Sequence, residues 1–130
     1  MYKKIALLFA AVFLAVGILG FVPGIAPKDD MGMRMLLGIF MVGAVHNIIH
    51  LASGVAALIA SKSNEYAKMY FKIFGLVYLL VTIIGLIQKD TVLGLIDINA
   101  ADNVLHIVIS AVTLFLGFGD PFKSKTVSAR

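Results

Sequence analysis

The sequence predicts an all-α fold, a four-helix transmembrane bundle that forms one domain over residues 1–130. Hydrophobic residues make up 61% of the chain and charged residues only 14%, and the mean hydropathy is +1.02. These values are typical of a membrane protein and not of a soluble domain. Four apolar runs cover roughly residues 5–22, 36–60, 69–88 and 100–118. Each run is near the length that crosses ~30 Å of lipid, and too little chain remains for a separate soluble domain.

The first run, residues 5–22, follows Lys3 and Lys4, a combination that also occurs in signal peptides. Its apolar part is longer than a typical signal core, so we expect a span that the mature protein retains. Small residues share one side of this helix and predict close helix packing; they are Ala6, Ala10, Gly17, Gly20 and Gly24. Glycine and proline residues at positions 23–27 then predict a turn.

The second run, residues 36–60, contains the stretch HNIIHLASG, from His46 to Gly54. Imidazole and carboxamide side chains are costly in hydrocarbon, so their presence in a span requires an explanation. On a helix, the polar and small side chains of this run share an arc of about 120°; they are Gly43, His46, Asn47, His50, Ser53, Gly54 and Ala57. We expect this face to contact neighbouring helices and the large aliphatic side chains to face lipid.

The third run, residues 69–88, has a stripe that we interpret as a packing surface, formed by Gly75, Tyr78, Thr82 and Gly85. The fourth run repeats the Asn-x-x-His pattern of the second, with Asn103 and His106 fifty-six positions after Asn47 and His50. Both runs cross the membrane in the same direction. A repeated helical hairpin is one arrangement consistent with this, and we expect the two polar faces to point at each other inside the bundle.

The distribution of basic residues predicts the orientation in the membrane. Eight of them fall at the two ends of the chain and in the middle loop, namely Lys3, Lys4, Lys62, Lys68, Lys72, Lys123, Lys125 and Arg130. Three fall on the other side, namely Lys28, Arg34 and Lys89. We therefore expect an integral membrane protein with both termini in the cytoplasm. The net charge of +4 is explained by this topology, and a chain with only two Arg does not indicate nucleic-acid binding.

Several classes of chemistry are excluded or not indicated. The chain has no Cys, so any metal must be held by nitrogen or oxygen atoms. It also lacks a nucleophile beside a base, paired intramembrane carboxylates, a glycine-rich phosphate loop and a zinc-protease motif. The sequence therefore does not indicate an enzyme, and four spans offer a transporter little cavity unless the protein forms a homo-oligomer.

The stretch GAVHNIIHLASG, residues 43–54, together with Asn103-x-x-His106, resembles a family of small bacterial four-span integral membrane proteins catalogued as a domain of unknown function. The resemblance covers most of the chain, and the His-Asn-x-x-His-Leu-x-x-Gly core carries most of its specificity. It implies the four-span fold, a location in the bacterial inner (cytoplasmic) membrane and no established activity. It also marks His46, Asn47, His50 and Gly54 as the characteristic positions of the family.

Two functions remain open at this point. In the first, His50 and His106, with His46 as a third ligand, bind haem, another tetrapyrrole or a metal ion, because neutral imidazoles are suitable ligands for all three. Asn47, Asn103 and Gly54 would support this cofactor site. In the second, the histidines only form hydrogen bonds between helices, and the protein is a small accessory subunit that packs against a larger membrane complex. Asp102 is either a residue that begins the fourth helix or a partner that orients His106.

Overall fold

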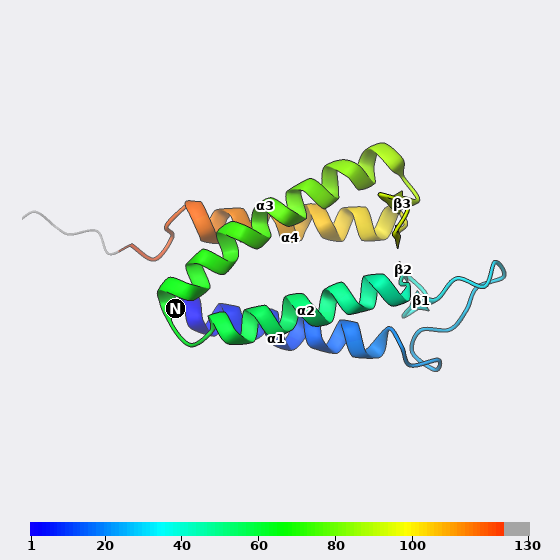
Figure 1. Ribbon diagram of the computed structural model, residues 1–130, viewed down its shortest axis with the longest axis horizontal. Coiled ribbons are helices and arrows are strands. Elements are labelled where there is room, and N and C mark those ends of the chain that lie inside the picture. Colours follow the sequence, from blue (N-terminus) through cyan, green and yellow to red (C-terminus); the bar gives the residue numbers. More distant parts are fainter. Residues whose placement is uncertain (124–130) are drawn as a thin grey trace, which may run out of the picture.

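The computed structural model describes residues 1–123 and consists of two helical hairpins (Figure 1). The helices are α1 (Tyr2–Leu19), α2 (Ala44–Ala60), α3 (Asn64–Gln88) and α4 (Ala100–Phe118). Helix α1 packs along α2, and α3 packs along α4. A short antiparallel strand pair precedes the second helix of each hairpin: β1 (Met35–Leu36) with β2 (Phe40–Met41), and β3 (Thr91–Val92) with β4 (Ile96–Asp97). The predicted all-α four-helix fold is confirmed.

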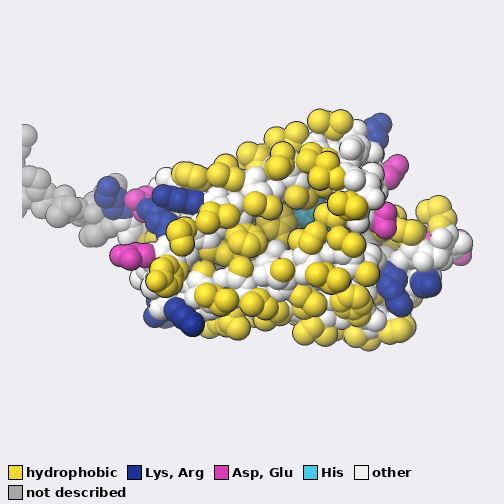
Figure 2. Space-filling view, in the orientation of Figure 1, with side chains coloured by type: hydrophobic (Ala, Val, Ile, Leu, Met, Phe, Trp, Pro, Cys, Tyr) yellow, Lys and Arg dark blue, Asp and Glu magenta, His cyan; other side chains and the backbone are white. Residues whose placement is uncertain are grey.

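Three helices of the described chain, α1, α3 and α4, are long and apolar enough to cross a membrane. Helix α2 is also apolar but has only 17 residues. The first part of the expected span over residues 36–60 is a strand hairpin and not a helix, because Leu37 and Gly38 have φ angles of 55° and 71°. Hydrophobic side chains cover the middle of the molecule, and charged side chains gather at its two ends (Figure 2).

The two ends of the bundle differ in which parts of the chain they contain. The N-terminus, the α2–α3 connection and the end of α4 lie together, and the strand hairpins lie at the opposite end (Figure 1). The Met1 amino group donates a hydrogen bond to Asn64 Oδ1 (3.4 Å), and the Tyr2 hydroxyl donates one to Asp120 Oδ1 (3.3 Å). The Lys68 ammonium group also donates to Asp120 and holds the pKa of this carboxyl below its usual range.

This arrangement places the described members of the eight basic residues at one end and the other three basic residues at or near the opposite end. Lys125 and Arg130, which belong to the same group of eight, lie outside the described residues. Which end faces the cytoplasm remains a prediction.

The two halves of the bundle repeat one structure. The strand pairs Leu36↔Phe40 and Val92↔Ile96 are fifty-six positions apart, as are the two Asn-x-x-His patterns. The turns match as well, since Leu93 and Gly94 have φ angles of 56° and 67°, close to those of Leu37 and Gly38. Two successive positive φ angles are typical of a type I′ hairpin turn, which glycine adopts without strain. The repeat therefore extends beyond the Asn-x-x-His pattern that indicates it in the sequence.

Helices α1 and α3, the first helices of the two hairpins, also correspond, but their equivalent residues are 65 positions apart instead of 56. A Cβ atom at Gly20 would collide with the side chain of Asn47, and one at Gly85 would collide with that of Asn103. Gly85 follows Gly20 by 65 positions, whereas Asn103 follows Asn47 by 56, so the connection in the first half is nine residues longer. This insertion is why a fixed spacing does not align α1 with α3.

The Gly85→Ala variant should be less stable by about 1–2 kcal/mol. The added methyl group would displace Asn103, whose Nδ2 donates hydrogen bonds to the carbonyls of Gly85 (3.3 Å) and Lys89 (3.5 Å). Thermal unfolding in mild detergent measures the change. Gly24→Ala is the matched control and should leave stability unchanged, because no atom lies within 4 Å of the added carbon. Equal effects of both variants would contradict the proposed contact.

Candidate functional site

Three histidines meet in the centre of the bundle. His46 and His50 lie one turn apart on α2, and His106 lies on α4. One possible ligand nitrogen from each ring lies within 4.8 Å of the other two. The three side chains are 3%, 5% and 3% exposed, so little of their surface is accessible from outside the protein. The expectation that the polar faces of the second and fourth spans point into the bundle is therefore borne out for these residues.

Aromatic rings from α1 and α3 surround the three imidazoles. The ring centroids of Phe13 and His50 are 5.6 Å apart, and those of Tyr78 and His106 are 5.8 Å apart. Phe13 and Tyr78 stack on each other with centroids 5.6 Å apart. Phe13 and Tyr78 are equivalent positions in the repeat, 65 residues apart, as Gly20 and Gly85 are. Each half of the molecule therefore supplies one aromatic ring and at least one histidine to the centre.

Most polar atoms of this cluster lack a hydrogen-bond partner within the described chain. Nδ1 of His50 and Nδ1 of His106 are buried and unpaired. The ring nitrogens of His46 and the hydroxyl of Tyr78 are buried without a well-aligned hydrogen bond, although backbone groups of Met41 and Asp97 lie near His46 and the Ser53 side chain lies near Tyr78. Buried polar groups are almost always hydrogen-bonded in proteins, and an unpaired one costs about 1–3 kcal/mol. The centre of the bundle therefore contains several buried polar atoms without a well-aligned partner in residues 1–123.

Asn47, Asn103 and Gly54 lie at contacts within each helical hairpin. The Asn47 side chain occupies the space left by Gly20 of α1, and Asn103 donates hydrogen bonds to carbonyls at the end of α3. A Cβ atom at Gly54 would lie 2.7 Å from Leu14 of α1. The structure therefore brings the three histidines together and places the two asparagines and Gly54 at helix-packing contacts.

A comparison with models of known protein families identifies the family of this chain. A family model matches residues 3–119, which include nearly all of the four helices. The chain belongs to this family, a domain of unknown function (DUF4383). No curated protein and no solved structure gave a significant match to the chain. Any activity of this DUF4383 protein must therefore be inferred from the geometry of the site.

Asp102 begins helix α4 in this DUF4383 protein. Its carboxylate accepts a hydrogen bond from the Asn99 backbone N–H (2.9 Å), and the Asn99 side chain accepts one from the Asp102 N–H (3.0 Å), forming a capping box. The same carboxylate oxygen accepts from the Met41 N–H of strand β2 (3.1 Å). Asp102 also lines a cavity of about 100 Å³ together with His50 and His106. It therefore joins the two halves and brings a carboxylate close to the histidines.

Sequence reasoning did not identify Phe13 as part of the site. Phe13 lies in an apolar run without any polar signal, and only its contacts with His50 and Tyr78 show its position. The one available signal was its place on the small-residue side of α1, between Ala10 and Gly17, which are also buried.

The Asp102→Ala variant should lower the free energy of unfolding by about 1–3 kcal/mol, because it removes the capping box and leaves the Met41 N–H unpaired. Thermal unfolding in detergent measures this change. Asp90→Ala is the matched control, since Asp90 is exposed and lies at the same end of the bundle. If the two variants were equally stable, the link between β2 and α4 would contribute nothing.

Proposed function

We propose that this protein binds one transition-metal ion inside the bundle, with His46, His50 and His106 as ligands. The observation that carries the proposal is the convergence of three buried imidazole nitrogens within 4.8 Å of one another. A metal ion lies ~2.0–2.1 Å from each imidazole nitrogen, so the three nitrogens must come slightly closer than they are in this structure. Small rotations of the side chains are sufficient for this.

The geometry favours a metal ion over haem or another tetrapyrrole. Two histidines that clamp such a ring lie on its opposite faces, and the macrocycle extends sideways between them. A third imidazole within 4.8 Å of both would occupy the place of the macrocycle. For a single ion, in contrast, the third imidazole is a useful ligand.

The unpaired nitrogens also favour a metal ion over a purely structural role. Asn103 joins helices through hydrogen bonds to the carbonyls of Gly85 and Lys89. The imidazole of His46 forms no well-aligned hydrogen bond within residues 1–123, although backbone groups of Met41 and Asp97 lie near it, and the buried amide of Asn47 has no partner either. A neutral imidazole nitrogen that lacks a hydrogen bond is available to coordinate a metal.

Imidazole ligands are suited to Zn²⁺, copper, Fe²⁺ and Ni²⁺, and three of them leave one coordination position open. The carboxylate of Asp102, which shares a cavity with His50 and His106, lowers the electrostatic cost of a cation at this depth. It does so while it caps α4, so a direct bond from Asp102 to the metal is not needed.

Metal analysis of protein purified in mild detergent tests the proposal. The protein should carry a tag other than polyhistidine, so that bound metal reflects the chain itself. After loading with Co²⁺ and removal of excess ion, we expect one ion per chain and visible absorption bands from the bound Co²⁺. His50→Ala and His106→Ala should each lower the affinity for Co²⁺ at least tenfold.

The matched control is Asn103→Ala, which should lower stability but keep one ion per chain, because Asn103 contacts α3 and not the histidine cluster. If the wild-type protein retained no more Co²⁺, Zn²⁺ or copper than a variant with all three histidines replaced, the proposal would be wrong. A structural subunit that packs against a larger membrane complex would then be the better interpretation.

We also propose that both termini and the α2–α3 connection lie in the cytoplasm, since this end carries most of the basic residues. The absence of Cys from the chain permits single-cysteine labelling without background. In intact cells, a cysteine at Lys28 should react with a membrane-impermeant maleimide, and one at Ser63 should react only after lysis. The reverse pattern would refute the orientation.

A further inference from the structure

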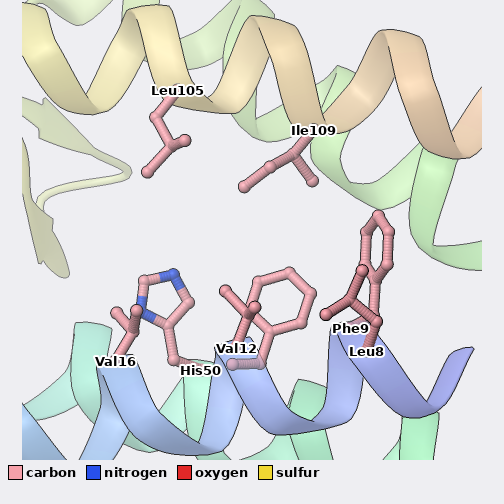
Figure 3. Close-up of a pocket in the computed structure, with 8 residues that line it drawn as sticks. Leu8, Phe9, Val12, Val16, His50, Leu105 and Ile109 are labelled. Atoms are coloured by element: carbon pink, nitrogen blue, oxygen red, sulfur yellow. The ribbon is translucent and has the colours of Figure 1, made fainter. Parts of the chain in front are cut away.

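Two cavities lie beside the histidine cluster, in the space between the two helical hairpins. The first, of about 200 Å³, lies between α1 and α4, and His50 faces it together with Val16, Leu105 and Ile109 (Figure 3). The second, of about 290 Å³, lies between α2 and α3 and is lined by all three histidines and Tyr78. The cluster therefore has a cavity on each side.

The two cavities have equivalent walls. The α1 side of the first is formed by Phe9, Val12, Phe13 and Val16. The α3 side of the second is formed by Phe74, Val77, Tyr78 and Val81, which follow those residues by 65 positions. A packing defect would not recur at equivalent places in both halves, because well-packed interiors contain few voids. The cavities are thus a feature of the repeated unit.

The cavities open toward lipid and contain no formal charge. Leu8 and Val12 at the first cavity are 61% and 52% exposed, and Val77 at the second is 48% exposed. Figure 2 shows histidine atoms in the hollow between the hairpins, surrounded by hydrophobic side chains. The residues that line both cavities include no Asp, Glu, Lys or Arg. A ligand must therefore be uncharged and must enter sideways from the membrane.

The polar group inside each cavity defines the remaining chemistry of the ligand. The only titratable side chain of the first cavity is His50, and His106 contributes an imidazole to the second; both histidines are at least nine-tenths buried. A neutral imidazole has one donor and one acceptor nitrogen, and a hydroxyl group can bond to either of them. The walls also bring two aromatic rings to each cavity, Phe9 and Phe13 in the first and Phe74 and Tyr78 in the second. Such walls favour a flat ring that stacks on them.

We propose that each cavity binds a lipid-soluble phenol with a single ring, which enters from the bilayer. The ring lies against the aromatic walls, and the hydroxyl group forms a hydrogen bond with His50 in the first cavity or His106 in the second. This inference does not rest on the proposed metal site, because the metal-free imidazoles are sufficient to bind the hydroxyl group.

Nitrogen NMR of the histidine rings tests the proposal on metal-free protein in lipid nanodiscs with EDTA present. The probe is 4-tert-butylphenol, and the matched compound is 4-tert-butylanisole, which lacks the hydroxyl donor. We expect the phenol to shift the ¹⁵N signals of His50 and His106 saturably, with an affinity at least tenfold higher than that of the anisole.

Variants that fill one cavity at a time provide the control. Val81→Phe should abolish the saturable shift of His106, which lines only the second of these cavities, and Val16→Phe should preserve it. His50 lines both cavities, so each variant should reduce its shift without abolishing it. Val108→Phe adds the same volume on an exposed surface outside both cavities and should change neither shift. Should a Phe variant fail to fold, Val16→Leu and Val81→Leu fill less space and should weaken binding at the same cavity.

A linear response that is the same in wild-type and filled variants would overturn the proposal. The phenol would then only dissolve in the lipid, and acyl chains would occupy the cavities. Equal saturable binding of the phenol and the anisole would also overturn it, since the histidines would then contribute no hydrogen bond.

Discussion

Polar side chains in hydrocarbon are unfavourable unless the protein encloses them, and this constraint organises the whole bundle. The three imidazoles of α2 and α4 are almost fully buried, and the helices that carry them turn their large aliphatic residues outward. Helices α1 and α3 complete the enclosure by close contacts at small residues: Gly20 accommodates Asn47, and Gly85 accommodates Asn103. The centre that results is polar, and many of its polar atoms have no well-aligned partner within the described chain.

The internal repeat explains which residues of this centre occur in both halves and which occur in only one. His50 and His106 are equivalent positions, as are Asn47 and Asn103, so each half supplies the same scaffold. The position equivalent to His46 is Asp102, and here the halves differ. His46 adds a third imidazole to the cluster, whereas Asp102 caps α4 and accepts a hydrogen bond from Met41 of the other half. One difference within a repeated unit thus places three imidazoles and one carboxylate at the centre of the bundle.

The two proposals describe different parts of one interior. A metal ion would lie among the three imidazoles, and lipid-soluble molecules would reach the same histidines through the flanking cavities. Both depend on a gap between two rigid helical hairpins, which pack tightly within themselves and loosely against each other. Small residues fill the contacts inside each hairpin, whereas aromatic and branched side chains line the space between them.

The sequence by itself determined that the helices are suited to lipid, how many helices there are and which face of each polar span points inward. It could do so because hydropathy and helical periodicity are local properties of the chain. It also indicated the repeat through Asn-x-x-His. Only the tertiary structure decided that residues 35–41 form a strand hairpin, since Leu37 gives no sign in the sequence of its positive φ angle. The same holds for the site: periodicity placed His46, Asn47 and His50 on one face, but contacts with other helices separated them. Asn47 packs on α1, and the histidines face the space between the hairpins, because packing depends on side chains distant in sequence.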